Sequence, residues 1–309
     1  MNKTKIELNY SAIHSIKEEN KMQKTNIEWV KNPDGTQGYS WNPLTGCLNG
    51  CDYCYARKLA FTRLRERYLA NKNTGYDGGA IAHDRWLIDT DPFYPRFWPD
   101  KLDQPLKRKK PAGIFTCDMS DLFGIGVPEQ WTWSVFNFIK ECPQHRFYLL
   151  TKQPQNLIKF SPYPPNCWVG VSAWDESSLV EAYNSLIRIE ARTKYISLEP
   201  FLGWGRLYEK HACKLSFLLG NRYDYPNNGI DWIIIGACTP YSQKTAPKIE
   251  WVREIVEAAD KAGVEVFLKD SLLPLVNVPD DLGSNYHLMY YDDEVGYHKL
   301  RQEFPKKGE

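Results

Sequence analysis

Residues 46–56 read GCLNGCDYCYA and place Cys47, Cys51 and Cys54 in a C-x3-C-x2-C array. Three thiols within eight residues are typical of metal or redox chemistry, whereas a disulfide scaffold would distribute its cysteines along the chain. Gly46 and Gly50 relieve backbone strain in such a tight loop. The array therefore predicts a metal centre. The other cysteines are scattered, at Cys117, Cys142, Cys167, Cys213 and Cys238.

The segments around this array predict an α/β fold. A strand-like segment (39–43) precedes the cysteines, a helical pattern (52–71) follows them, and residues 72–112 are expected to be an irregular insertion. Beyond it, short apolar strands alternate with amphipathic helices, which predicts parallel βαβ units. Seven candidate strands favour a complete or partial (β/α) barrel over two domains. The later strands are expected at 114–117, 146–150, 167–171, 194–198, 232–235 and 264–268, and helices at 129–141, 153–160, 176–189 and 249–262.

Composition limits the class of partner. The 309 residues carry 39 Lys and Arg against 38 Asp and Glu, a net charge of +1, so no global attraction to nucleic acid or an anionic membrane is expected, although a local basic groove is not excluded. No apolar run approaches the roughly 20 residues that span a bilayer. The polar N-terminus lacks the pattern of a signal peptide, which predicts a cytoplasmic protein. Residues 1–24 are expected to be a mobile extension and residues 271–309 a capping segment.

The spacing of the three cysteines also narrows the metal. Three thiolates on a [4Fe–4S] cluster leave one iron open to a small molecule that binds through an amine and a carboxylate. A structural zinc site has four protein ligands, and the sequence holds no second C-x-x-C or H-x3-5-H pair, so zinc would have to recruit Cys117 or a distant histidine. An electron-transfer ferredoxin would need a fourth clustered cysteine. The open cluster is favoured.

The array, with Tyr53 before its third cysteine, resembles the signature of the radical S-adenosylmethionine (SAM) superfamily. More closely, the chain resembles a phage-associated radical-SAM-like family of unassigned function, over roughly residues 22–270. The resemblance implies a radical SAM-like partial (β/α)6-type TIM barrel over residues 25–270, with the insertion after its first helix. The matching stretches are TNIEW (25–29), WNPLTGC (41–47), CYA (54–56), MSDLF (119–123), LTKQP (150–154), WVGVS (168–172), SLEPFLG (197–203) and DWIIIG (231–236).

The resemblance also implies roles for individual residues. Cys47, Cys51 and Cys54 match the cluster ligands, and Tyr53 matches an aromatic residue near the adenine of SAM. The superfamily's Gly-Gly-Glu motif is missing at the end of the second strand, where Asp118 or Ser120 would have to replace it. Further contacts to the ribose and methionine parts of SAM are expected from Ser172, Asp175 and Glu199. Helix capping by Ser172 or Asp175 is an equally good interpretation of those two residues.

Two departures from this family fall at the predicted catalytic face, which in such folds lies at the carboxyl ends of the strands. Residues 236–240 read GACTP where relatives carry Gly-Gly-Glu-Ser-Gly, and residues 269–272 read KDSL where relatives often carry Lys-Gln-Trp-Gly. Cys238 and Lys269 are therefore candidate catalytic residues. The alternatives are a different substrate, and inert packing of the Cys238 thiol.

Two functions remain open from the sequence. The first is a radical SAM enzyme that uses a [4Fe–4S] cluster to cleave SAM reductively, giving a 5′-deoxyadenosyl radical that acts on a substrate. Nucleic acid or a nucleobase is favoured as that substrate, because the relatives are phage-associated and 11 tryptophans offer stacking surfaces. Expected partners are a flavodoxin- or ferredoxin-type reductant and a three-Cys-motif partner protein, with no membrane. The second function is a non-catalytic protein that binds nucleic acid or a partner through an Fe–S or zinc site.

Overall fold

The computed structural model describes residues 21–75, 82–205, 229–276, 287–292 and 297–306. Most of the expected N-terminal extension, residues 1–20, lies outside the described part. The last residues of the expected extension are described and belong to the sheet. There, β1 (Gln23–Lys24) pairs antiparallel with β2 (Tyr39–Trp41), so the sheet begins before residue 25. None of the helices within the described ranges is both long and apolar enough to cross a membrane.

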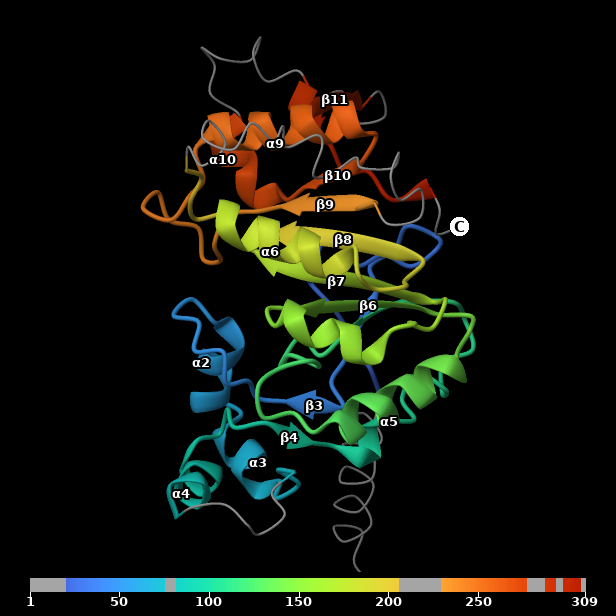
Figure 1. The fold of residues 1–309 in the computed structure, drawn as a ribbon, viewed down its shortest axis with the longest axis vertical. Helices are drawn as coiled ribbons and strands as arrows, with labels where there is room; N and C mark the ends of the chain where they lie inside the picture. The colour runs from blue at the N-terminus through green and yellow to red at the C-terminus, as the bar shows by residue number, and fades with distance from the viewer. Residues whose placement is uncertain (1–20, 76–81, 206–228, 277–286, 293–296, 307–309) are drawn as a thin grey trace, which may run out of the picture.

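A sheet of eight strands in the order β1-β2-β5-β6-β7-β8-β9-β10 forms the centre of the molecule (Figure 1). All neighbouring pairs except β1–β2 are parallel. The predicted largely parallel α/β sheet is thus confirmed, and the seven predicted strands are its seven parallel strands. Their bounds are Tyr39–Trp41 (β2), Gly113–Thr116 (β5), Arg146–Thr151 (β6), Cys167–Ala173 (β7), Thr193–Leu198 (β8), Trp232–Ile235 (β9) and Glu265–Leu268 (β10).

The sequence predicts five helical segments, and each contains a helix in the structure, although the one expected over 52–71 is divided into two helices, Tyr55–Phe61 and Arg65–Ala70. The segment expected to be helical over 153–160 is a 3-10 helix, η2 (Pro154–Phe160). Its buried residues Pro154, Leu157 and Phe160 recur every three positions, which is the period of a 3-10 helix rather than an α-helix. The other helices are α2 (Tyr55–Phe61), α3 (Arg65–Ala70), α4 (Ala82–Thr90), η1 (Pro99–Lys101), α5 (Glu129–Lys140), α6 (Glu176–Leu186), α9 (Ile249–Ala262), η3 (Asp270–Leu272) and α10 (Leu273–Val276).

The insertion at 72–112 is more regular than predicted. It contains α4 and β4 (Arg96–Phe97), and β4 pairs with β3 (Leu44–Thr45) in a small separate sheet. The reason is Arg96, whose fully buried guanidinium donates to the carbonyls of Tyr68 (2.6 Å), Ile88 (2.6 Å) and Tyr94 (3.0 Å). These bonds tie α3, α4 and β4 together. A further hairpin, β11 (Met289–Asp292) with β12 (Tyr297–Leu300), lies in the C-terminal segment.

The sheet curves around a single indole, that of Trp29. Its ring lies edge-on to Phe115 (5.4 Å between centroids), Tyr148 (5.6 Å), Tyr195 (5.6 Å) and Trp232 (5.8 Å). These four rings come from β5, β6, β8 and β9. In a flat sheet, β5 and β9 would be about 19 Å apart, because adjacent strands are separated by about 4.8 Å. Contact with one indole therefore requires strong curvature.

The opposite face of the sheet packs against helices (Figure 1). Alternate strand residues such as Phe147, Val169 and Ile196 join the larger core cluster, together with the buried faces of α5, α6 and α9. Most of the tryptophans that were considered as stacking surfaces for a substrate lie in the core. Trp29, Trp41 and Trp232 are 1%, 0% and 0% exposed, so they are core residues and cannot stack on a substrate; Trp174 remains half-buried.

We predict that Trp29→Ala lowers the free energy of unfolding by about 3–5 kcal/mol, because it opens a large cavity among four strands. Urea denaturation followed by tryptophan fluorescence and circular dichroism measures the change. Trp86→Ala is the matched control: this indole is 61% exposed, and its loss should change stability by no more than about 0.5 kcal/mol. Equal effects of the two substitutions would contradict the central role of Trp29.

Candidate metal centre and surrounding site

The three clustered cysteines lie in the loop between β3 and α2, beside the ends to which the strand arrows point (Figure 1). The backbone holds this loop in place: the Gly46 N–H donates to the Met119 carbonyl (2.9 Å) and the Cys47 N–H to the Phe93 carbonyl (2.8 Å). Gly46 has a φ of +87°, and a Cβ there would lie 2.3 Å from the Tyr94 carbonyl oxygen, so only glycine fits.

The thiols are close enough to one another to interact electrostatically. Burial, and then the carboxylate of Asp121, raises the pKa of Cys47 to about 12. Burial also raises the pKa of Cys51, while the ammonium of Lys152 acts in the opposite direction. Cys54 accepts a hydrogen bond at Sγ from the Arg57 N–H (3.4 Å) and so caps the start of α2. Since metals bind thiolates, metal binding at this loop releases protons.

The three thiols are candidate ligands of a metal centre. In the described ranges, no three His, Cys, Asp or Glu side chains converge as one metal ion would require. A tetrahedral zinc site needs such convergence because all its ligands meet at one atom. A four-iron cluster does not, because each of its thiolates binds a different iron. The preference for a cluster over zinc therefore rests on the sequence, where three cysteines are clustered and no fourth lies beside them.

A buried carboxylate, that of Asp121, fixes the middle of the cysteine loop. Asn49, between Cys47 and Cys51, donates to Asp121 (3.3 Å) and accepts from the Gln153 side chain (2.5 Å). Burial raises the pKa of Asp121, and its hydrogen bonds counteract that shift. The loop is thus tied to the end of β6. The remaining donors to Asp121 are the Thr151 hydroxyl (2.8 and 3.0 Å), the Lys152 N–H (2.9 Å) and the Phe123 N–H (3.0 Å).

Lys152, directly after β6, places a positive charge at the centre of the site. Its ammonium lies 5.7 Å from the Tyr53 ring centroid and 5.9 Å from that of Trp174. Burial lowers its pKa, while Cys51, Asp121 and Glu199, among other groups, act to raise it. Lys152 therefore lies between the cysteine loop and the end of β8, flanked by two aromatic rings that favour a cation.

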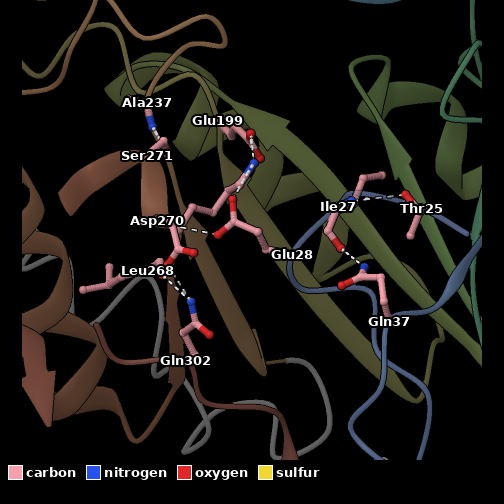
Figure 2. Close-up of polar contacts among 11 residues, drawn as sticks. Thr25, Ile27, Glu28, Gln37, Glu199, Ala237, Leu268, Asp270, Ser271 and Gln302 are labelled. Carbon is pink, nitrogen blue, oxygen red and sulfur yellow. Dashed lines mark hydrogen bonds and ion pairs between the residues drawn. The ribbon is translucent and has the colours of Figure 1, made fainter. Parts of the chain in front are cut away.

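A second charged cluster joins Glu199, Lys269 and Glu28 (Figure 2). The ammonium of Lys269 pairs with Glu199 and lies 3.8 Å from Glu28, while the Asp270 N–H donates to Glu28 (2.8 Å). Burial raises the pKa of Glu28, and the Asp270 N–H and Lys269 counteract it. Gly236 makes this packing possible, because a Cβ there would lie 2.9 Å from the Lys269 side chain.

The predicted replacements for the missing Gly-Gly-Glu motif lie at the same edge of the sheet. Asp118 accepts hydrogen bonds from Ser40 (2.8 Å) and Asn42, and burial raises its pKa. Ser120 donates to the Gly46 carbonyl (2.6 Å) and so supports the cysteine loop. The residue before them, Cys117, has a φ of +67°, a conformation that glycine adopts far more easily.

The remaining candidates divide between structural and site positions. Asp175 caps α6. Its carboxylate accepts a hydrogen bond from the Ser178 N–H (2.8 Å), and the Ser178 hydroxyl oxygen accepts one from the Asp175 N–H (3.0 Å). This reciprocal pair confirms the capping interpretation for Asp175. Ser172 is a buried residue of β7 and does not cap the helix. Cys238, after β9, is half-buried and interacts electrostatically with Tyr53, which itself hydrogen-bonds to Cys51. Tyr53 thus links Cys238 to the cysteine loop.

Four contributors to the site were given no role from the sequence: Glu28, Asn49, Asp121 and Lys152. A signal existed for Lys152, because it directly follows a predicted strand, and carboxyl ends of strands carry sites in this architecture. Asp121 and Glu28 lie within stretches on which the family resemblance rests, but nothing in their spacing indicated partners so distant in the chain. Asn49 has no signal beyond its place between two cysteines.

Comparison with known proteins gives a family and a set of similar folds. A family model described as "Protein of unknown function (DUF5131)" matches residues 24–271. The sequence matches no curated protein. Among solved structures, a cysteine-to-alanine mutant of spore photoproduct lyase has 12% identity and a TM-score of 0.49, covering 81% of this chain and 79% of that one. A double mutant of that lyase with bound AdoMet and dinucleoside spore photoproduct has 14% identity and a TM-score of 0.41, covering 92% and 71%.

We predict that Asp121→Asn reduces iron loading several-fold, because an amide cannot accept from all the donors that hold Asn49 and the end of β6. The measurement is the iron-to-protein ratio after anaerobic reconstitution. Asp231→Asn is the matched control: this buried carboxylate accepts from the Lys194 N–H (2.9 Å) at the starts of β8 and β9, the opposite edge of the sheet. The control should lose comparable stability and still load iron; parallel losses of iron in both variants would remove the role of Asp121.

Proposed function

The chain belongs to the DUF5131 family of proteins of unknown function, which its residues 24–271 match, and we propose that it is a radical SAM enzyme. The observation that carries this proposal is the C-x3-C-x2-C loop at the carboxyl edge of a parallel sheet whose strands follow one another in sequence order. Its three thiols are close enough to one another to interact electrostatically. This arrangement suits a cluster with one open iron.

In this proposal Cys47, Cys51 and Cys54 hold a [4Fe–4S] cluster, and SAM binds beside them. The chemistry that these cofactors supply when bound is the reductive cleavage of SAM to methionine and a 5′-deoxyadenosyl radical. The chain's own contribution is to bind and orient. Lys152 offers a positive charge for the carboxylate of SAM, and the ring of Tyr53 is assigned to the adenine.

Other residues are assigned to SAM according to whether their side chains already have a structural role. Glu199 reaches the space near Lys152 and is the preferred contact for the ribose hydroxyls. Asp118, Ser120 and Ser172 line the same edge of the sheet, and we retain them as contacts to the methionine part. Asp175 already caps α6, so its role toward SAM is indirect.

We also propose that the curved sheet is a partial (β/α)6-type barrel over residues 25–270. Strands that follow one another in sequence order are typical of that architecture, and the four rings around Trp29 require the sheet to curve. In a barrel the carboxyl ends of all strands face one common site. This would bring the Lys152 and Glu199–Lys269 groups around one ligand.

Cys238 and Lys269 are the proposed catalytic residues. Cys238 lies near Tyr53, on the side of the cysteine loop, and supplies a thiol for the step on the substrate. Lys269 holds a proton at Nζ between Glu28 and Glu199. A Cys238→Ala variant that still converts the substrate would remove the thiol from this role.

The substrate class that we favour is nucleic acid or a nucleobase, and the electron would come from a flavodoxin- or ferredoxin-type protein. A three-Cys-motif protein is a proposed partner, and the phage association of the family is retained as a prediction. The second candidate function is non-catalytic binding of nucleic acid or a partner around an Fe–S or zinc site. This second function depends on the same cysteines. An assay of SAM cleavage distinguishes the two functions, because only the radical SAM enzyme cleaves SAM.

We expect anaerobically reconstituted protein with dithionite and SAM to form 5′-deoxyadenosine, detected by mass spectrometry. Cys54→Ala should abolish this product because a cluster ligand is lost. Cys142→Ala is the control: its thiol is buried after α5, away from the cysteine loop, and its loss should leave 5′-deoxyadenosine formation unchanged. A full cluster without any product would favour the non-catalytic function, and zinc in place of iron would overturn the proposal.

Lys152→Met should weaken SAM binding about tenfold or more, because a buried carboxylate would lose its counter-charge. Equilibrium dialysis on reconstituted protein measures the affinity, and Lys152→Arg should retain most of it. Decarboxylated SAM is the decisive ligand: since it lacks the carboxylate, its affinity should not fall in Lys152→Met. If both ligands lose affinity equally, Lys152 does not bind the carboxylate.

A further inference from the structure

The segment that follows the cysteine loop concentrates the positive charge of the protein. Residues 52–72 hold six Lys and Arg but only two acidic residues, Asp52 and Glu66, a net charge of +4 against +1 for the whole chain. Positive charge gathered on one segment of a nearly neutral protein is the electrostatic pattern of an anion-binding surface. The six cations are Arg57, Lys58, Arg63, Arg65, Arg67 and Lys72.

Neighbouring carboxylates cancel only part of this charge. Arg57 pairs with Asp91 (3.3 Å), Lys72 with Asp89 (3.1 Å) and Arg65 with Glu66 (3.0 Å). The Lys72–Asp89 and Arg65–Glu66 pairs are exposed and therefore weak, so a polyanion can compete for Lys72 and Arg65; the Asp91 side chain is only 13% exposed. The side chains of Lys58 and Arg63 are exposed as well and add to the positive charge.

Exposed aromatic rings occur on α2, which carries two of these cations, and on α4. Tyr55 and Phe61, at the two ends of α2, are 49% and 44% exposed, and Trp86 on α4 is 61% exposed. The guanidinium of Arg57 lies 4.9 Å from the Phe61 ring centroid. Exposed rings together with cations are the components of surfaces that bind single-stranded nucleic acids, where bases stack on rings and cations contact phosphates.

This surface begins at the candidate metal centre. Cys54 caps α2, and the hydroxyl of Tyr55, the first residue of α2, donates to the Asp118 carbonyl (2.7 Å). From there α2 contacts α3 and α3 contacts α4, and the Lys72–Asp89 pair joins the last two. Figure 1 shows α2 beside the carboxyl ends of the strands, with α3 and α4 farther out. A ligand on these helices would therefore extend to the cysteine loop.

We propose that the outer surface of α2, α3 and α4, the α2–α4 surface, binds a single-stranded nucleic acid beside the cysteine loop. A single strand is specified because its unpaired bases present the flat faces that exposed rings can stack on, whereas a duplex covers them. The inference rests on the proposed function and deepens it by naming the substrate class. It can be tested without iron or SAM.

The test uses fluorescence anisotropy of a labelled oligothymidine of about 12 nucleotides, titrated with protein before reconstitution at several salt concentrations. The double variant Lys58→Glu/Arg63→Glu should bind at least about tenfold more weakly. The slope of log affinity against log salt should fall by about 1.4, because each lost phosphate contact contributes about 0.7. The control Lys107→Glu/Lys109→Glu makes the same charge change in another exposed basic run and should bind like the unmodified protein.

The contribution of stacking is tested by Trp86→Ala, which should weaken oligonucleotide binding about tenfold with little change in the salt slope. Trp133→Ala is its control, because this indole is 40% exposed but lies on α5 and packs on Phe136 and Phe160. Circular dichroism of all four variants confirms that they are folded. Unchanged binding by Trp86→Ala would overturn the stacking surface.

Other outcomes also decide the matter. Equal losses in the two charge-reversal variants, or equal displacement of the oligonucleotide by polyglutamate, would overturn the proposal because they indicate unspecific charge attraction. Tighter binding of a duplex of the same length would overturn the single-stranded assignment. A protein that cleaves SAM but binds no oligonucleotide would refute only the α2–α4 surface. A protein that binds the oligonucleotide but never cleaves SAM would refute only the radical SAM function.

Discussion

The contact of Trp29 with four strands is the constraint on which the rest of the structure depends. Its indole fills the concave side of the sheet, so the strands have to turn around it. That curvature brings the ends of β6, β8 and β10 toward one another, and with them Lys152, Glu199 and Lys269. The preceding residue, Glu28, is itself part of the charged cluster, so one short segment supports both the core and the site.

The charged side chains of the site have neighbours that reduce the free-energy cost of burying them. Lys152 lies between the acidic group Asp121 and the rings of Tyr53 and Trp174, and Lys269 lies between two carboxylates. Buried charges are costly unless they are paired and hydrogen-bonded, and each of these has partners. Because these partners come from loops that adjoin different strands, their interactions also relate the positions of the strand ends.

The sequence was sufficient to predict the parallel sheet, because each buried strand is a short apolar run between turn residues, as at Trp232–Ile235. It was also sufficient to place Cys47, Cys51 and Cys54 in one short loop, because they are close in the chain; their role as cluster ligands stays a prediction. It was not sufficient for the insertion, where Arg96 organises three segments through carbonyl groups that carry no sequence signature. Nor could it distinguish a central indole from an exposed one: Trp29 and Trp86 differ only in what surrounds them.

The contacts of the N-terminal segment have a consequence for how the chain is made. Glu28 accepts a hydrogen bond from Asp270, 242 residues later, and Trp29 meets Trp232 almost as far along the chain. Strands β5 to β8 can pair with their neighbours as they leave the ribosome, but the indole of Trp29 gains its last partners only after most of the protein has been synthesised. The segment around Glu28 and Trp29 therefore leaves the ribosome early but completes its contacts late. Until then its apolar surface stays exposed.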